Sequence, residues 1–186
     1  MAFSRRSKTG YDSYSSPRQP QSVVSWYEWV EEIMAAVVVV VLIFTFFLRI
    51  VTVSGTSMYP NYHDGDRLSI TNSFNQQGDV VVLVNVLEEP IIKRVIATEG
   101  QQVDINFETG TVYVDGEALD ESQFGLENGI TVETNAPLEH TSFPATVPEG
   151  HIFVLGDNRL VSEDSRYTEV GMVDVRKVLG KAEFRL

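Results

Sequence analysis

Apolar residues follow two distinct patterns along the chain. Residues 33–48 form an unbroken apolar run, IMAAVVVVVLIFTFFL, that contains no charge and a single hydroxyl. From about residue 51 onward, short runs that alternate apolar and polar positions are separated by turns rich in Gly, Asp and Asn. The first pattern is typical of a helix that crosses a membrane, and the second is typical of β-strands joined by turns.

The apolar run predicts one transmembrane helix. Its 16 residues cover roughly 24 Å as a helix, a little short of a hydrocarbon core of about 30 Å. Trp26, Tyr27 and Trp29 suit one membrane interface, and Arg49 can snorkel at the other end. Because no site of small residues follows the run, an anchor over residues 26–50 fits better than a cleaved signal peptide or a buried core helix.

The rest of the chain predicts a mainly β fold. Residues 102–119, QVDINFETGTVYVDGEAL, contain two alternating runs joined at Thr109-Gly110, with a second turn at Asp115-Gly116. Residues 118–147 are polar, and we expect a loop or a small excursion from the sheet there. The other strand-like runs are DRLSI (66–70), DVVVLVNVL (79–87), IIKRVIAT (91–98), HIFVL (151–155) and VLGKAEFRL (178–186).

Charge divides the chain at the same places. Residues 1–25 are rich in Ser, Pro and Gln and carry four basic residues against one acidic residue. This composition predicts a disordered tail, which the positive-inside rule places in the cytoplasm. Residues 51–186 carry 9 Lys and Arg against 22 Asp and Glu, and we expect them to form an extracytoplasmic domain of a protein that crosses the cell membrane once, through residues 26–50.

Composition also excludes several classes of chemistry. An acidic domain repels phosphates, so nucleic-acid binding is not expected. The chain has no cysteine, which excludes thiol catalysis, disulfides and zinc–thiolate sites. The acidic residues do not form an EF-hand pattern, so no metal is expected.

Ser57 is a candidate nucleophile in the turn VSGTSMYP, residues 53–60. A serine in such a turn is usually a turn residue, and a nucleophilic one needs a base. His63, His140 and His151 show no pattern that would orient one of them as in a triad. A nucleophilic Ser57 therefore requires a base of another kind.

Lys93 is the candidate base. Strand alternation places it on one face with Ile91, Val95 and Ala97. A single cation on such a face is usually a gatekeeper at a sheet edge. Burial that lowers the lysine pKa from about 10.4 to about 8 leaves roughly a tenth of the molecules neutral at pH 7, which allows a dyad with Ser57.

Three motifs connect these two residues to a known family. SGTSMYP (54–60), GDVVV…IIKRVI (78–96) and GDNRLVSEDSR (156–166) closely resemble, in this order, the motifs of the type I signal peptidases, membrane-anchored Ser-Lys enzymes that remove signal peptides. The likeness extends to VYVDGEAL, VPEGHIFVLGDNR and the terminal GKAEFRL. It implies coiled antiparallel β-sheets behind one anchor, no cofactor, and secreted preproteins as substrates in the same lipid bilayer.

The resemblance implies roles for the reacting residues. Ser57 is the nucleophile, and its backbone N–H helps to hold the oxyanion. Lys93 is the general base, and Ser162 hydrogen-bonds the lysine and orients it. The residues expected to line the substrate pocket are Met58, Ile91 and Ile92.

The resemblance also implies residues that support the dyad. Asp164 and Arg166 form an ion pair that Arg94 joins. Gly156 and Asp157 shape the loop that brings Ser162 to the dyad.

The chain departs from the family pattern in several places. Gly55 stands where some members have a serine in the oxyanion hole, so a second oxyanion donor is unassigned. Asn61 replaces a usual threonine, and KRVIATEGQ replaces KRVIGLPGD after the base. Leu160 and Val161 put apolar side chains into a loop that is often polar, where they either pack on the pocket or touch the bilayer.

Two alternatives remain open. A soluble Ser-Lys autopeptidase, like the SOS-response repressors, cuts itself at Ala-Gly or Cys-Gly, and the chain contains neither dipeptide. A non-catalytic partner in pilus or surface-protein assembly is expected to have lost the serine or the lysine, whereas Ser57 and Lys93 are both present. The changes at Asn61 and Glu99 keep this second alternative open.

Overall fold

The structure is a computed structural model that describes residues 21–46, 49–71, 76–133 and 139–186. The chain divides into two compact units, residues 1–43 and 44–186. Of the predicted tail, residues 1–25, the first 20 residues lie outside the described residues, and residues 21–25 are helical.

The helix α1 spans Gln21–Phe46 and forms the described part of the first unit, which ends at residue 43. The helix begins at Gln21, five residues earlier than the anchor predicted at 26–50. At the other end, residues 47–48 lie outside the described residues, and Arg49 and Ile50 belong to a strand. No helix in the described part of the chain is long and apolar enough to cross a membrane.

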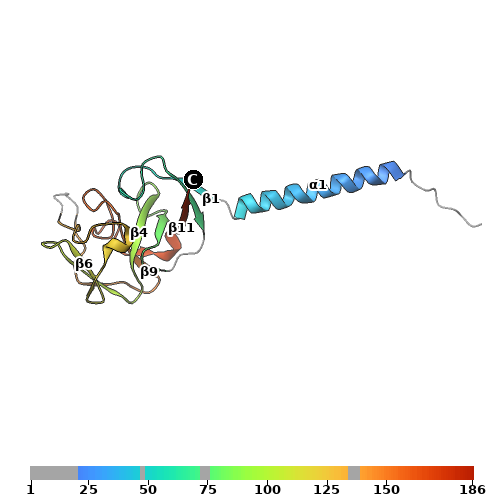
Figure 1. The fold of residues 1–186 in the computed structure, drawn as a ribbon. Coiled ribbons are helices and arrows are strands. Elements are labelled where there is room, and N and C mark those ends of the chain that lie inside the picture. The colour runs from blue at the N-terminus through green and yellow to red at the C-terminus, as the bar shows by residue number, and fades with distance from the viewer. Residues whose placement is uncertain (1–20, 47–48, 72–75, 134–138) are drawn as a thin grey trace, which may run out of the picture. The chain divides into compact units, whose positions relative to one another are not determined.

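The second unit is built on a sheet of seven antiparallel strands (Figure 1). Their order in the sheet is β1-β2-β11-β3-β4-β9-β10. The mainly β, antiparallel fold expected from the sequence is confirmed. The strands are Arg49–Thr52 (β1), Arg67–Thr71 (β2), Val80–Leu83 (β3), Ile91–Thr98 (β4), His151–Leu155 (β9), Val173–Asp174 (β10) and Val178–Arg185 (β11).

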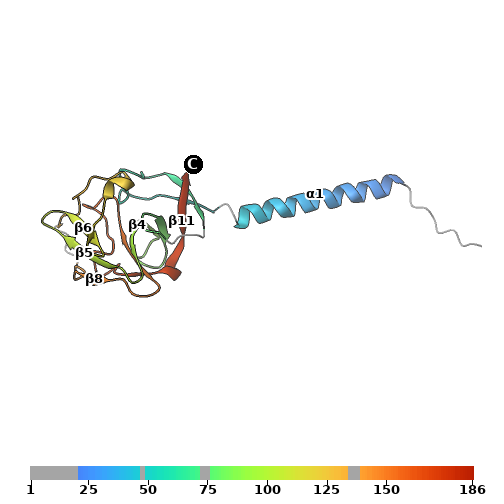
Figure 2. The same ribbon diagram turned by 60° about the horizontal axis from the view of Figure 1, so that its bottom comes forward.

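A second sheet has four strands in the order β7-β6-β5-β8, and β5, β6 and β8 lie side by side in Figure 2. Its hairpins turn where the sequence predicted, with Gly110 and the pair Asp115-Gly116 at positive φ. The strands are Gln102–Asn106 (β5), Thr111–Val114 (β6), Glu117–Ala118 (β7) and Ala145–Thr146 (β8). Two short 3-10 helices, η1 (Glu121–Phe124) and η2 (Val175–Lys177), complete the elements.

The strand predicted over residues 79–87 is shorter than expected. β3 ends at Leu83, and Asn85 adopts a positive φ of 57°. This left-handed conformation cannot continue a β-ladder, and asparagine tolerates it better than other side-chain-bearing residues. The apolar sequence VVVL of β3 is buried on both faces, as in a strand inside a closed core.

β4 belongs to the seven-stranded sheet, packs against the second sheet and carries the candidate base. Its six central residues are all buried, and its ladder with β9 shifts register between Val95 and Ala97. Because of this bulge, Ile96 and Ala97 both pack into the core cluster formed with β5, β6 and β9. The expectation that Ala97 shares one face with Lys93 and Val95 is therefore wrong, since strict alternation ends at the bulge.

Candidate active site

The nucleophile candidate lies in a loop fixed at several points between β1 and β2. Gly55 adopts a positive φ of 84° and donates its N–H to the carboxylate of Asp64 at 2.8 Å. The carbonyl of Ser57 accepts a hydrogen bond from the backbone N–H of Asn158 at 2.9 Å. Hydrogen bonds from two sides thus determine the position of Ser57.

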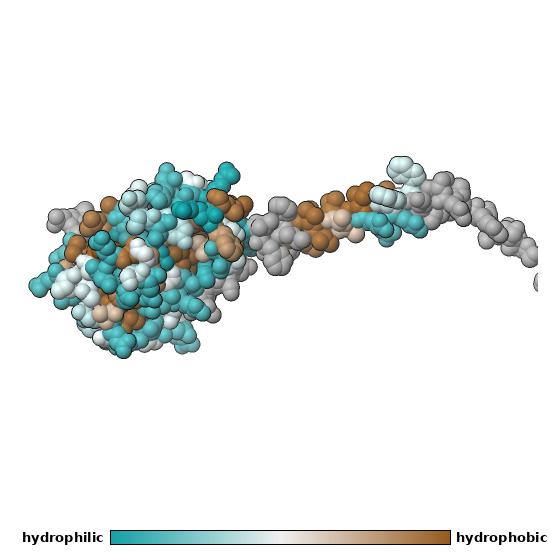
Figure 3. All heavy atoms as spheres, viewed as in Figure 1, coloured by the Kyte–Doolittle hydropathy of each residue, from teal (hydrophilic) through white to brown (hydrophobic). Residues whose placement is uncertain are grey.

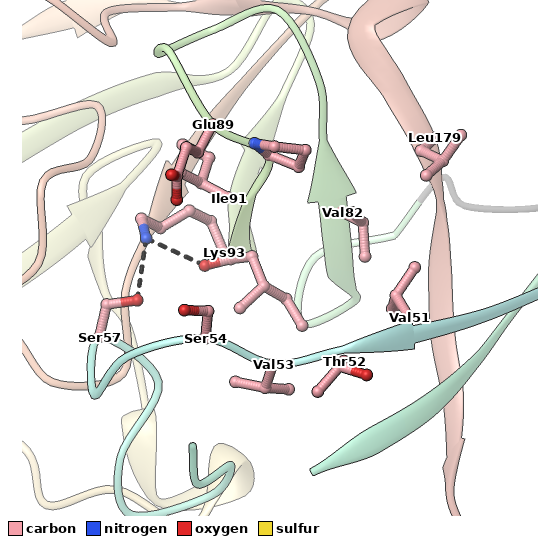
Figure 4. Close-up of a pocket in the computed structure, with 12 residues that line it drawn as sticks. Val51, Thr52, Val53, Ser54, Ser57, Val82, Glu89, Ile91, Lys93 and Leu179 are labelled. Carbon is pink, nitrogen blue, oxygen red and sulfur yellow. Dashed lines mark hydrogen bonds between the residues drawn. The ribbon is translucent and has the colours of Figure 1, made fainter. Parts of the chain in front are cut away.

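Lys93 reaches Ser57 across the sheet. Its Nζ donates to Ser57 Oγ at 3.1 Å and to the backbone carbonyl of Ile92 at 3.0 Å (Figure 4). The lysine is only 3% exposed, in the middle of β4 and opposite Val81 of β3. The two residues that the sequence singled out separately, 36 positions apart, are therefore brought together.

The surroundings of Lys93 favour its neutral form. Burial lowers the pKa of this lysine from 10.5 to about 8, because the charged form loses hydration. The carboxylates of Asp164, Glu163 and Asp157 act in the opposite direction and raise it. Desolvation is the largest of these effects, so an appreciable fraction of the lysine is neutral near pH 7 and can accept a proton.

A cavity of about 390 Å³ opens beside the pair. Its lining is mostly apolar and includes the expected Ile91 and Ile92, and Glu89 lies at its wall (Figure 4). Met58 does not line it. That side chain is 1% exposed and packs in a core cluster with residues such as Leu68 and Ile70, because the loop turns it inward next to Ser57.

Ser162 lies close to the pair without the expected bond. Its side chain is buried, and among the described residues its Oγ has no hydrogen-bond partner. A Cβ on Gly156 would overlap the Ser162 side chain and come within 2.7 Å of the Ser57 carbonyl. Glycine is therefore required where the loop passes between the two serines, and Lys93 is bonded to Ser57 and Ile92 instead of Ser162.

Asp164 and Arg166 form the ion pair that the motif implied. Arg166 Nε lies 2.8 Å from Asp164 Oδ1, and both side chains are at most 1% exposed. Asp164 also accepts the N–H of Gly156 at 2.9 Å, while Arg166 Nη2 donates to the carbonyl of Ser162 at 3.2 Å. The pair therefore fixes both ends of the loop that carries Ser162.

Arg94 does not join this pair. It donates from Nε and Nη2 to the carboxylate of Asp157, at 2.8 and 2.6 Å. As the next residue after Lys93 in a strand, it points to the opposite face of β4. Asn61, the departure from threonine, donates to the same Asp157 carboxylate at 2.8 Å and to the carbonyl of Phe124 at 2.9 Å, so the asparagine supports the site.

Arg159, Glu121 and Thr131 were missed by the sequence analysis. The Arg159 guanidinium pairs with the Glu121 carboxylate and the Thr131 hydroxyl, all buried, and donates from Nε to the carbonyl of Gly156 at 2.8 Å. We call these three residues the arginine clamp. Its partners come from the polar stretch 118–147, where nothing in the sequence marked an acidic residue as buried.

None of the three histidines, all of which lie in the described part of the chain, lines the cavity beside Ser57. His63 contacts Asp66 near the surface, and the ring of His140 packs against Tyr167. His151 lies 2.8 Å from the carbonyl of Glu149. Lys93 is thus the titratable base that the geometry offers to Ser57.

Comparisons of the sequence with known families and proteins agree on one family. The profile described as "Signal peptidase, peptidase S26" matches residues 26–186. Signal peptidase I of Bacillus amyloliquefaciens is 32% identical over 138 residues, which cover 71% of this chain and 70% of the relative. Signal peptidase IB of Staphylococcus aureus is 30% identical over 153 residues, covering 75% and 78%. The crystal structure of a signal peptidase I from Enterococcus faecalis matches with 31% identity and a TM-score of 0.47, over 61% of this chain and 100% of that one.

Proposed function

The chain belongs to the signal peptidase family, peptidase S26, and we propose that it removes signal peptides from secreted preproteins with Ser57 as nucleophile and Lys93 as general base. The observation that carries this assignment is the 3.1 Å contact between Lys93 Nζ and Ser57 Oγ. It is supported by the lowered pKa of the lysine, about 8, which matches the requirement for a base near neutral pH.

The proposed reaction proceeds in two steps. Neutral Lys93 accepts the hydroxyl proton of Ser57 as its Oγ attacks the carbonyl carbon of the scissile bond. The oxyanion is held by the backbone N–H of Ser57, and the lysine ammonium then protonates the leaving amine. Water next attacks the acyl-enzyme, with Lys93 again as base, and releases the signal peptide.

The cavity beside the dyad suits the residues before the cleaved bond. Its walls include Val51, Val53 and Ile92, which leave room for small apolar side chains. The substrate would lie extended along the wall formed by residues 89–93, in the manner of an added strand. Ser162, the Asp164–Arg166 pair and the arginine clamp keep the loop opposite Lys93 in place.

We also propose that α1 anchors the enzyme in the membrane, as the sequence predicted for residues 26–50, with the N-terminus in the cytoplasm and residues 51–186 outside. The support is the uncharged apolar run from Ile33 and the exposure of its side chains. Residues 37–42 of α1 are 47–56% exposed and apolar (Figure 3). Enzyme and preprotein in one membrane would meet at a raised effective concentration.

The function is tested by incubating the intact chain, in detergent micelles, with a panel of purified preproteins. We expect one cut, between the signal peptide and the mature protein, identified by sequencing the new N-terminus. A well-folded chain that cuts no preprotein in the panel would favour the alternative of an assembly partner without catalytic activity.

The pH dependence of cleavage should report the titration of Lys93. We expect kcat/KM to rise about 50-fold between pH 6 and pH 8, because the neutral fraction of a lysine with a pKa of about 8 rises from about 1% to about 50%. A profile with its acid limb near pH 6 would instead indicate a histidine.

Replacing Glu163 by glutamine should move this acid limb to lower pH. The Glu163 carboxylate raises the pKa of Lys93, so its removal lowers the pKa and increases the activity at pH 6 to 7. Glu169→Gln is the matched control, since Glu169 is an exposed carboxylate of the same segment that is not among the groups shifting Lys93. Equal profiles for all three proteins would contradict the assignment of Lys93 as the titrating base.

A further inference from the structure

A peptide substrate continues on both sides of the bond that is cut. The cavity beside the dyad borders residues 51–54 and Ser57 and accommodates the side before the bond. The mature protein that follows the bond must therefore leave Ser57 over another part of the surface.

A second apolar groove begins directly after Ser57. It has a volume of about 540 Å³, and its lining includes Tyr59, Pro60, Leu126, Ile130, Val132 and Leu160. We call it the downstream groove.

A single residue, Asn158, connects the downstream groove to the backbone of the nucleophile. Asn158, which also lines it, donates its backbone N–H to the carbonyl of Ser57 at 2.9 Å and its amide to the carbonyl of Thr56 at 3.2 Å. An extended chain advances about 3.3 Å per residue. The first few residues after the cleaved bond are therefore long enough to pass from Ser57 into the groove.

We propose that the downstream groove binds the first residues of the mature protein, in an extended conformation, with apolar side chains against Leu160 and Ile130. This inference rests on the proposed function. It makes the groove a determinant of substrate preference on the mature side of the cut.

Exposure and rigidity both support this assignment. Leu160 and Tyr59 are 65% and 53% exposed, and Leu160 stands in a loop that the family motif usually fills with polar residues. The arginine clamp fixes the backbone of this loop, since Arg159 directly precedes Leu160 and is fully buried. The apolar side chain is thus presented outward by a fixed backbone, as in a preorganised binding site.

Charge favours the same occupant. Glu127 lies in the lining of the groove, and its carboxylate favours basic side chains in the segment that follows the cut.

The test compares two peptide substrates with the same signal-peptide end. One continues for several residues after the cut with Leu at the second and fourth positions, and the other has Ser there. Leu160→Ser should lower kcat/KM for the Leu substrate by about tenfold, since the apolar side chain loses its contact area, and leave the Ser substrate within about twofold. Phe184→Ser is the control, because Phe184 is 70% exposed and lines neither cavity.

The other outcomes overturn the inference in distinguishable ways. An equal loss on both substrates would mean that Leu160 only supports the fold of the loop. Unchanged discrimination, together with weaker binding of the Leu160→Ser protein to phospholipid vesicles, would make the exposed residues a membrane contact. If the parent cuts neither peptide nor any preprotein, the proposed function itself fails, and the inference fails with it.

Discussion

Replacing Lys93 by methionine should abolish cleavage and, in the same protein, raise the free energy of unfolding by about 3 kcal/mol at pH 7. Activity should fall at least about 1,000-fold, because in the described part of the chain Lys93 is the one base that is hydrogen-bonded to Ser57 Oγ. The gain in stability follows from the depression of the lysine pKa from 10.5 to about 8, since each unit corresponds to about 1.4 kcal/mol of preference for the neutral form. Methionine has a similar length and volume, so no cavity is created.

The size of this gain in stability depends on pH. Below pH 8 the folded protein must either bury a charged lysine or release its proton, and the parent bears the full cost. Between pH 8 and 10.5 the folded protein has released this proton while the unfolded chain still holds it, so the parent gains stability as the pH rises and the difference between parent and variant declines. Urea unfolding of the intact chain at pH 7 and at pH 10.5 should therefore give a large gap at the first pH and a small one at the second.

Ser57→Ala is the matched control for this prediction. It should lose activity to a similar extent but change the unfolding free energy by no more than about 1 kcal/mol, because it removes one hydrogen bond and no buried charge. A Lys93→Met protein that is less stable than Ser57→Ala at pH 7 would show that Lys93 is well solvated, and the dyad would lose its physical basis.

Sequence reasoning proposed Ser57 and Lys93 from their residue types and from three ordered motifs that resemble a known family. The strand pattern alone did not identify Lys93 as a base, because a single cation on an apolar strand face is usually a gatekeeper at a sheet edge. The hairpin turns at Gly110 and Asp115-Gly116 were predictable from residue type, since positive φ selects a few residue types.

The parts that sequence reasoning missed depend on contacts across long distances in the chain. Asn61 and Asp157 meet over a separation of 96 residues, and Glu121 and Arg159 over 38. No local pattern identifies such partners. The orientation of Met58 was missed as well, because it depends on how the loop turns against β2 after Ser57.

Breaking the ion pair between Arg94 and Asp157 should cost the fold about 3–5 kcal/mol. In Asp157→Leu, the guanidinium loses two charge-assisted hydrogen bonds and stays in a site where its side chain is 9% exposed. Asn61 loses an acceptor in the same variant. The unfolding free energy from urea titration measures the effect, and the loss of support for Gly156 should also reduce kcat.

The double variant Arg94→Met/Asp157→Leu distinguishes a charge effect from a loss of shape. If the cost of the single variant comes from an uncompensated buried charge, removing both partners should recover most of it, because apolar side chains of similar volume replace buried ion pairs at little cost. Arg176→Met is the reference for an exposed pair, since Arg176 is 86% exposed beside Asp174, and it should change the unfolding free energy far less than Asp157→Leu does. A double variant as unstable as Asp157→Leu would assign the role of Asp157 to its hydrogen bond with Asn61 instead.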